Sequence, residues 1–289
     1  MTASLRTEPF IDGLHFAEAP RWHDGRLWFS DFHDEAVFSV DPDGDRRREV
    51  DVPGRPSGLG WLPDGRLLVV CMQQRTVLRQ ESDGTLVHHG DLTPWATFHA
   101  NDMVVSAEGR AYVGNFGFDL QPMFEGRETE IRTASVVRVD PDGTSVEAAS
   151  DLSFPNGSVL FPDGRTLVVA ETLGARLTAF DVARDGSLSG RRVWADLPHC
   201  TPDGICLDED GHIWVANAFT AECFLVAEGG RIIRSVETTQ PCFACMLGDT
   251  DRHTLYCVTA PTSDDRVTRE RRSGRIERAR VVAGGAGLP

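Results

Sequence analysis

Two short stretches of the chain decide its fold: residues 64–70 read DGRLLVV, and residues 163–170 read DGRTLVVA. In each stretch an Asp-Gly pair, a common signal for a tight turn, is followed at once by a run of apolar and β-branched residues. That combination predicts a β-strand that begins at a hairpin turn. Long amphipathic helical patterns are absent from the sequence, so an all-β fold is expected.

The same signal recurs along the whole chain. Six copies begin 40, 44, 55, 47 and 41 residues apart, at Asp24-Gly25, Asp64-Gly65, Glu108-Gly109, Asp163-Gly164, Asp210-Gly211 and a degenerate Asp251-Arg252. A second series of turns lies about half a period later, at Asp41–Gly44, Asp83-Gly84, Asp140–Gly143, Asp185-Gly186 and Gly229-Gly230. Each period therefore holds two hairpins, which supply four strands.

Periods of roughly 40–50 residues built from four strands are typical of β-propeller blades. The prediction is an all-β, six-bladed β-propeller with four antiparallel strands per blade, forming a single domain over residues 1–289. A β-sandwich with frequent turns is the alternative. Closing the ring requires a partner for the last strands, near 255–259 and 274–282, and we expect the N-terminal segment Phe10–Leu14 to supply it.

Composition narrows the class of protein. The net charge of −15 disfavours a surface that binds nucleic-acid phosphates, and the absence of lysine excludes a Schiff-base lysine mechanism. No apolar run approaches the ~20 residues that span a bilayer. The seven cysteines are an odd number, and several lie in apolar strand-like runs, as buried free thiols do. A cytoplasmic protein that binds a small molecule, but neither nucleic acid nor membrane, is expected.

Counting back seven residues from the turns locates one shared position in each blade. Blades three, four and five carry Asn101, Asn156 and Asp203 there, while blades two and six carry Ser57 and Ala244. In blade one, Glu18 lies six residues before Asp24. The position marks the start of the innermost strand, and these strands all run the same way along the axis of a propeller. Polar side chains from four blades are thus expected to converge at one mouth of the channel.

Two carboxylates and two amides make an oxygen-only ligand set. Such a set favours a divalent cation, with Ca²⁺ first and Mg²⁺, Mn²⁺ or Zn²⁺ as alternatives. Each residue also has a simpler interpretation. The sequences around Asn156 and Asp203 resemble ordinary Pro-Asn-Gly and Pro-Asp-Gly turns, Asn101-Asp102 resembles an Asx-turn, and Glu18 could pair with Arg21 on a rim.

At these residues the sequence resembles the regucalcin/gluconolactonase family, also called the senescence-marker-protein family. The matching pieces are Glu18–Trp22, Asn101-Asp102, Pro155–Gly157, Pro202–Gly204 and the stretch from Ala170 to Asp181. The resemblance spans roughly residues 15–260 and implies a six-bladed propeller with one divalent cation and, most commonly, lactone hydrolysis.

The resemblance also implies roles for individual residues. Glu18, Asn156 and Asp203 would hold the cation, and Asp203 would also be the general base. Asn101 would lie beside the cation and bind substrate or a water. The family often carries arginine two residues before Asn101, whereas this chain has His99. An arginine there would suit an oxygen-rich sugar-acid lactone, whereas histidine is smaller and can be neutral, so gluconolactone is not expected to be the native substrate.

The spacing of 55 residues between blades three and four predicts an additional loop. It should lie within residues 115–132 and is a candidate cover for the mouth, with a plain surface loop as the alternative. Phe116 is expected to bind substrate beside His99, and Phe118 and Phe219 are further candidates for an apolar wall. The arginine-rich stretch 266–280 is expected to be a solvated outer hairpin of blade six.

Other catalytic patterns are missing. The sequence has neither a G-x-S-x-G elbow nor an H-E-x-x-H motif, and Cys242-Phe243-Ala244-Cys245 is interpreted as strand packing. The sequence therefore predicts a metal-dependent hydrolase that opens a lactone or similar cyclic ester. A phosphotriesterase-like hydrolase and a non-catalytic calcium-binding propeller remain alternatives, with a strictosidine-synthase-like propeller as a more distant one. The substrate, the metal and the oligomeric state are left open.

Overall fold

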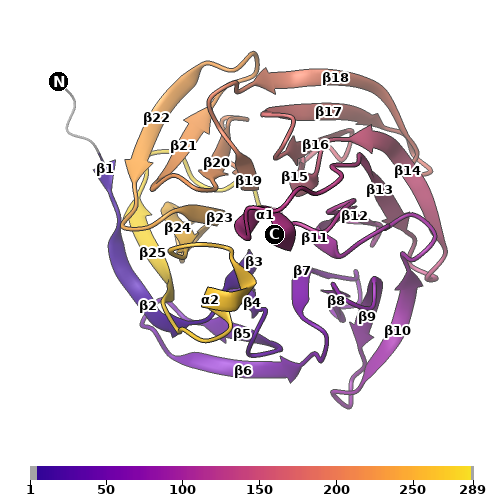
Figure 1. Cartoon of the computed structure of the whole chain (residues 1–289), viewed down its shortest axis with the longest axis horizontal. Coiled ribbons are helices and arrows are strands. Elements are labelled where there is room, and N and C mark those ends of the chain that lie inside the picture. Colours follow the sequence, from indigo (N-terminus) through magenta and orange to yellow (C-terminus); the bar gives the residue numbers. More distant parts are fainter. Residues whose placement is uncertain (1–4, 288–289) are drawn as a thin grey trace.

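A computed structural model describes residues 5–287, which form six sheets arranged around a central axis (Figure 1). The prediction of a six-bladed β-propeller is confirmed. Blades one to three contain β3 (Ala17–His23), β4 (Arg26–Asp31), β5 (Ala36–Val40) and β6 (Arg46–Asp51); β7 (Pro56–Trp61), β8 (Leu67–Cys71), β9 (Thr76–Gln80) and β10 (Leu86–Asp91); β11 (Ala100–Val105), β12 (Ala111–Asn115), β13 (Ala134–Val139) and β14 (Ser145–Leu152).

Blades four to six follow the same order. They contain β15 (Pro155–Leu160), β16 (Thr166–Glu171), β17 (Arg176–Val182) and β18 (Leu188–Asp196); β19 (Pro202–Leu207), β20 (Ile213–Asn217), β21 (Glu222–Val226) and β22 (Ile232–Glu237); β23 (Cys242–Gly248), β24 (Thr254–Thr259) and β25 (Gly274–Arg280). The first strand of every blade is the innermost one, and each inner strand contacts the inner strands on both sides of it.

The burial pattern of the strands explains this order. β11, β15, β19 and β23 are buried along their whole length, whereas the outer strands β6 and β22 are mostly exposed. Continuous apolar runs such as 67–71 therefore belong to the inner part of a blade, and the arginine-rich β6 belongs to its rim. The Asp-Gly turns used to count the blades connect the first strand of a blade to the second, as expected.

Glycines permit the inner strands to approach one another near the mouth of the channel. A Cβ atom on Gly157 would lie 2.6 Å from the backbone oxygen of Asp203, and one on Gly204 would lie 2.6 Å from the Cα of Ala244. Both glycines follow a predicted site residue directly. The Pro-Asn-Gly and Pro-Asp-Gly sequences are thus the first residues of β15 and β19, and their interpretation as ordinary turns is wrong.

The ring closes through the N-terminal segment, as predicted. β2 (Glu8–Leu14) pairs antiparallel with β25 as the fourth strand of blade six. β1 (Leu5–Arg6) adds a short parallel strand to β22 in blade five. Phe10 of β2 packs against Tyr256 of β24 with 5.3 Å between ring centroids. The outer edge of the last blade is therefore covered by the beginning of the chain.

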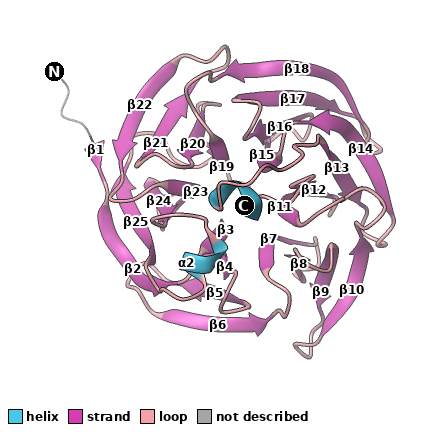
Figure 2. Ribbon diagram, in the orientation of Figure 1, coloured by secondary structure: helices cyan, strands magenta, loops and turns pink. Residues whose placement is uncertain are grey.

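Two short helices are the only helices in the described residues; one lies over the centre of the ring, and the other lies off-centre near β3 and β4 (Figure 2). α1 (Gln121–Phe124) belongs to the additional loop, which connects β12 to β13 within blade three, and α2 (Asp265–Thr268) connects β24 to β25. The expectation of a solvated outer hairpin over 266–280 is wrong, because this stretch begins inside α2 and continues into β25, the third strand of blade six. Neither helix is long or apolar enough to cross a membrane.

Five of the seven cysteines are buried where blades five and six meet: Cys206, Cys223, Cys242, Cys245 and Cys257. They belong to one apolar cluster that also contains Trp214 and Tyr256. The C-x-x-C pair accordingly lies in the packed interior of β23, as the sequence interpretation had it.

Deleting residues 1–14 should markedly lower the melting temperature, because β25 would lose its partner and the apolar contacts of Phe10 would be exposed. Thermal unfolding followed by circular dichroism measures the change. Asp12→Asn, an exposed substitution in the same strand, is the control. A truncated protein as stable as the full chain would contradict this mode of closure.

Candidate active site

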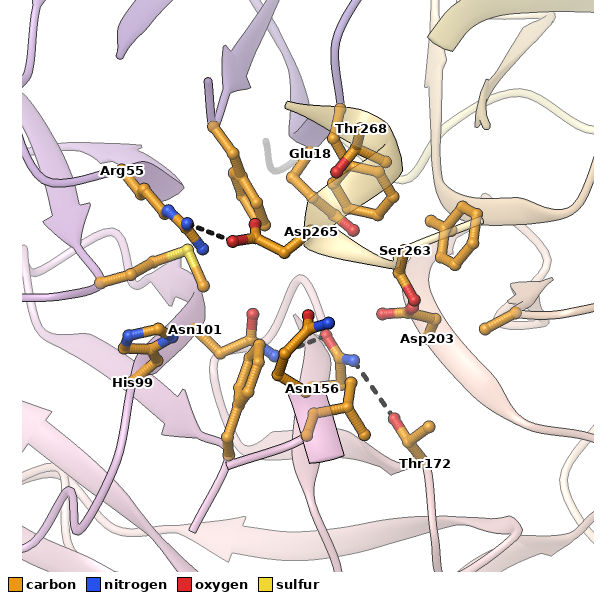
Figure 3. A pocket seen from close by; sticks show the side chains of 18 of the residues that line it. Glu18, Arg55, His99, Asn101, Asn156, Thr172, Asp203, Ser263, Asp265 and Thr268 are labelled. Carbon is orange, nitrogen blue, oxygen red and sulfur yellow. Dashed lines mark hydrogen bonds and ion pairs between the residues drawn. The ribbon is translucent and has the colours of Figure 1, made fainter. Parts of the chain in front are cut away.

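The second residue of four inner strands points into one cavity at the mouth of the channel (Figure 3). These residues are Glu18 of β3, Asn101 of β11, Asn156 of β15 and Asp203 of β19, and all four are buried. The cavity has a volume of about 220 Å³. The common register read from the turns thus corresponds to a common place in the fold.

Blade six departs from that register. β23 has seven residues where β11, β15 and β19 have six, so counting back from the turn is wrong by one. Phe243, and not Ala244, lines the cavity, and Ala244 packs in the core. The contribution of blade six to the mouth is therefore an aromatic ring.

A chain of hydrogen bonds fixes the two amides. Asn101 Nδ2 donates to Asn156 Oδ1 at 2.9 Å, and Asn156 Nδ2 donates to Thr172 Oγ1 at 3.2 Å. The Thr172 hydroxyl donates in turn to the backbone oxygen of Pro202 at 2.8 Å. Because the single proton of that hydroxyl is used in the hydrogen bond to Pro202, its oxygen can only accept a hydrogen bond from Asn156. The orientation of the Asn156 amide follows, with its oxygen on the side of Asn101.

The carboxylates of Glu18 and Asp203 have fewer partners, since within residues 5–287 Glu18 Oε2 accepts a hydrogen bond only from the backbone N–H of Ala19 at 3.1 Å. Burial raises the pKa of Glu18 well above its ordinary value, and the neighbouring Asp203 and Asp102 raise it further. Burial and then Asp102 likewise raise the pKa of Asp203. Asp203 Oδ1 is buried and has no hydrogen-bond partner among the described residues. Such an atom carries a desolvation penalty that a bound cation would offset.

One buried arginine lies close beneath these carboxylates. Arg21 donates to Asp102 Oδ1 at 2.7 Å, and the two side chains are 4% and 7% exposed. Arg21 also donates to the backbone oxygens of Pro20 and Met103. Arg21 therefore pairs with Asp102 inside the channel and not with Glu18 on a rim. Asp102 lies in β11, so its interpretation as part of an Asx-turn is also wrong.

These residues fit a divalent cation. When all of them ionise, the three carboxylates of Glu18, Asp102 and Asp203 exceed the single guanidinium of Arg21 by two negative charges. The ligand atoms available at the mouth are carboxylate and amide oxygens, which hard cations prefer. The unpartnered Oδ1 of Asp203 lies within that set.

Both helices approach the cavity from the solvent side. Gln121 Nε2 of α1 donates to Asp264 Oδ1 at 3.1 Å, and Arg266 of α2 donates to the backbone oxygen of Phe124 at 3.2 Å. These contacts join the β12–β13 loop of blade three to the β24–β25 loop of blade six (Figure 1). The loop 115–132 therefore lies over the mouth, as one of its two interpretations required.

His99 and Phe116 both line the cavity, as does Phe219. His99 stacks on Phe98 with ring centroids 4.1 Å apart, and burial together with the nearby Arg55 lowers its pKa to about 4. The imidazole is thus neutral at neutral pH. Phe118 does not line the cavity and packs behind it against Phe154.

Several cavity residues were missed by the sequence interpretation. Arg55 and Asp265 form an ion pair of 2.6 Å at the wall, and Thr172 orients Asn156 (Figure 3). Arg55 lies two positions before Ser57, so it occupies in blade two the place that His99 occupies in blade three. This position relative to the inner strand was the one sequence signal that could have identified Arg55. Nothing in the strand pattern indicated Asp265, because it lies in the short helix α2 between two strands.

Residues 16–261 match the family described as SMP-30/gluconolactonase/LRE-like region. The chain belongs to that family. Among curated relatives, regucalcin of Xenopus laevis is 25% identical over 90% of this chain and 84% of its own length. Pentonolactonase XacC of Haloferax volcanii is 27% identical over 86% and 82%. Diisopropyl-fluorophosphatase of Loligo vulgaris is 26% identical, but the match spans only 57% of this chain and 55% of that protein.

Solved structures of the SMP-30/gluconolactonase/LRE-like family share the fold. A gluconolactonase of Xanthomonas campestris superposes with a TM-score of 0.76 at 24% identity, covering 96% of this chain and 89% of its own. A calcium-binding regucalcin of Agrobacterium tumefaciens superposes with a TM-score of 0.81 at 19% identity, covering 100% and 99%. At these identities the likeness concerns the arrangement of the blades.

Replacing Arg21 with Met should lower the free energy of unfolding by about 3–5 kcal/mol, because Asp102 would stay buried without its partner. Urea denaturation measures the loss. The double variant Arg21→Met/Asp102→Leu removes both charges and should recover most of it. If the single variant were as stable as the parent, Arg21 would not be the partner that compensates Asp102.

Proposed function

We propose that this protein is a divalent-metal-dependent hydrolase that opens a lactone or a similar cyclic ester. The observation that carries the proposal is the gathering of Glu18, Asp203, Asn101 and Asn156 in one cavity, with a buried carboxylate oxygen of Asp203 left unpartnered. Lactonases among the relatives support the reaction class.

In this proposal Glu18, Asn156 and Asp203 hold the cation. A cation at that place would polarise the carbonyl of the lactone and stabilise the negative charge that develops on its oxygen. Ca²⁺ is favoured by the oxygen-only donor set, with Mg²⁺, Mn²⁺ and Zn²⁺ as alternatives. The calcium-binding regucalcin among the structural neighbours supports the same choice.

Asp203 is the proposed general base. Its carboxylate takes a proton from a water molecule while the water oxygen forms a bond to the carbonyl carbon. The ring C–O bond then breaks, and the proton held by Asp203 passes to the departing alkoxide oxygen. The product is the open hydroxy acid, which ionises to the carboxylate. Water and lactone are the only reactants consumed.

Asn101 is the proposed positioning group for substrate. Its Nδ2 is committed to Asn156, so its Oδ1 is the atom available to accept a hydrogen bond from a water or a hydroxyl in the cavity. His99 and Phe116 border the same space. The bridged helices α1 and α2 limit the access of bulk water, which strengthens electrostatic interactions inside the cavity.

A phosphotriesterase-like activity is the second candidate. The similarity to diisopropyl-fluorophosphatase supports it, and the same cation and carboxylate would serve attack at phosphorus. A comparison of γ- and δ-lactones with phosphotriesters on purified protein separates the two. Turnover of phosphotriesters without turnover of any lactone would replace the proposed reaction.

Asp203→Asn should lower kcat by about 10²-fold or more while the protein stays folded, because an amide cannot accept the proton. Lactone hydrolysis followed by pH indicator gives the rate, and circular dichroism checks the fold. Asp210→Asn, an exposed aspartate in the turn after the same strand, should be unchanged. Unaltered turnover in Asp203→Asn would remove this residue from the mechanism. A parent protein without turnover would instead favour a non-catalytic calcium-binding propeller.

Removing the cation with a chelator should abolish turnover and lower the melting temperature. Adding Ca²⁺ at 100 times its dissociation constant should restore about 2.7 kcal/mol of stability, because the cation binds only the folded chain. Scanning calorimetry at several Ca²⁺ concentrations measures the gain. Glu18→Gln should reduce the gain, and an equal gain in that variant would place the cation elsewhere.

A further inference from the structure

Phenylalanine rings form most of the apolar surface of the cavity. Eight phenylalanines line it, and they fall into two groups on different blades. The first aromatic wall comes from blades one, five and six and from α1; it contains Phe16, Phe32, Phe124, Phe219 and Phe243. The second aromatic wall lies at blades three and four and contains Phe98, Phe116 and Phe154.

The rings of each wall contact one another and make continuous surfaces. In the first wall, the ring centroids of Phe16 and Phe243 are 4.9 Å apart, and those of Phe219 and Phe243 are 6.3 Å apart. In the second wall, Phe116 and Phe154 are 4.7 Å apart in an edge-to-face arrangement. Asn101, Asn156, Glu18 and Asp203 form a polar floor, and further polar side chains, among them Arg55, Asp119 and Asp265, line the cavity above it.

The polar groups above the floor are largely paired with one another. The Arg55 guanidinium is 2.6 Å from Asp265, so the one arginine that lines the cavity is already neutralised. Gln121 donates to Asp264, and the Thr172 hydroxyl is used between Asn156 and Pro202. His99 lies flat against Phe98. His99, Asp119 and Ser263 are polar side chains of the walls that these pairs leave available to a substrate, beside eight phenylalanine rings.

The cavity volume limits the size of the ligand. A cavity of about 150 Å³ lined by apolar side chains accommodates one benzene molecule. The volume of about 220 Å³ found here is larger and is open at the mouth. It accommodates a lactone ring over the polar floor together with one apolar substituent of about the size of a phenyl ring between the walls.

We propose that the substrate is an uncharged lactone bearing an aromatic or similarly bulky apolar substituent, and not a polyhydroxylated sugar lactone. This inference rests on the proposed hydrolase function and adds the substrate class. The carbonyl lies over the floor, and the substituent packs between the first and second aromatic walls.

Desolvation explains the discrimination. A sugar lactone would bring several hydroxyl groups against phenylalanine rings, and each hydroxyl that loses its water without a new partner weakens binding. A phenyl substituent gains from the same surface through burial and edge-to-face contacts. A free carboxylate on the substrate would find Arg55 already paired with Asp265 and would meet the acidic floor.

The test compares three γ-lactones that share one ring: γ-butyrolactone, γ-phenyl-γ-butyrolactone and ribono-1,4-lactone. kcat/KM is measured on the Ca²⁺-loaded full chain, and each value is divided by the rate of hydroxide-catalysed hydrolysis of the same compound. The normalised value for the phenyl compound should exceed that for the ribonolactone on the order of 10²-fold. An equal or reversed preference would overturn the proposed substrate class while leaving the hydrolase function intact. Absence of turnover on every lactone would instead reject the hydrolase function, and the substrate class with it.

Variants of the walls test whether the rings cause the preference. Phe219 is 54% exposed at the rim, so Phe219→Ser should leave the fold intact. It should lower kcat/KM for the phenyl lactone about 5- to 10-fold and leave γ-butyrolactone within about twofold. Phe116→Ala, deeper in the cavity, should show the same selective loss with a larger factor.

Val193→Ser is the matched control, since Val193 is 57% exposed on the outer strand β18, away from the cavity. It should leave kcat/KM unchanged for both γ-butyrolactone and the phenyl lactone. A parallel loss on both lactones in Phe219→Ser and Phe116→Ala would mean that the rings support the fold and do not contact the substituent, which would overturn the proposal.

Discussion

The close approach of the inner strands around the axis is the constraint on which the rest of the structure depends. Neighbouring inner strands come so near at the mouth that glycine is required after Asn156 and after Asp203. The same approach brings the side chains just before those glycines into one small volume. Asp203 is thus held out of water near Glu18 of β3, and its proximity raises the pKa of Glu18 beyond the effect of burial. The proposed cation site is a consequence of this packing.

The sequence was sufficient to predict the blades and the floor of the cavity. Both follow from a local signal, the Asp-Gly turn, which recurs with the period of one blade and lies six to eight residues after the cavity-facing residue of the inner strand. The one error in the register, Ala244 for Phe243, arose because β23 is a residue longer than β11, β15 and β19. A rule based on turn spacing cannot detect such a change in strand length.

The walls of the cavity could be predicted only in part. Phe116 and Phe219 were identified as candidates for an apolar wall, but no role was predicted for Asp265, which directly precedes the arginine-rich stretch 266–280. Its contacts with Arg55 join blade two to the end of the chain, and sequence separation of that size leaves no local pattern. Loops also have no period that would place them. The floor residues can therefore be predicted because they occupy the same position in successive blades. The wall residues lie in connections that differ from blade to blade, and so they cannot be predicted in this way.

The pairing of β2 with β25 sets an order in which the protein can be completed. Glu8 and Arg278 are neighbours in blade six although 270 residues separate them. During synthesis the first strand leaves the ribosome long before its partner exists, so blade six cannot be completed until nearly the whole chain has been translated. Until then β2 is an unpaired strand beside a growing row of blades. The circle, and with it the contact between β23 and β3 that completes the channel, forms only after translation is nearly finished.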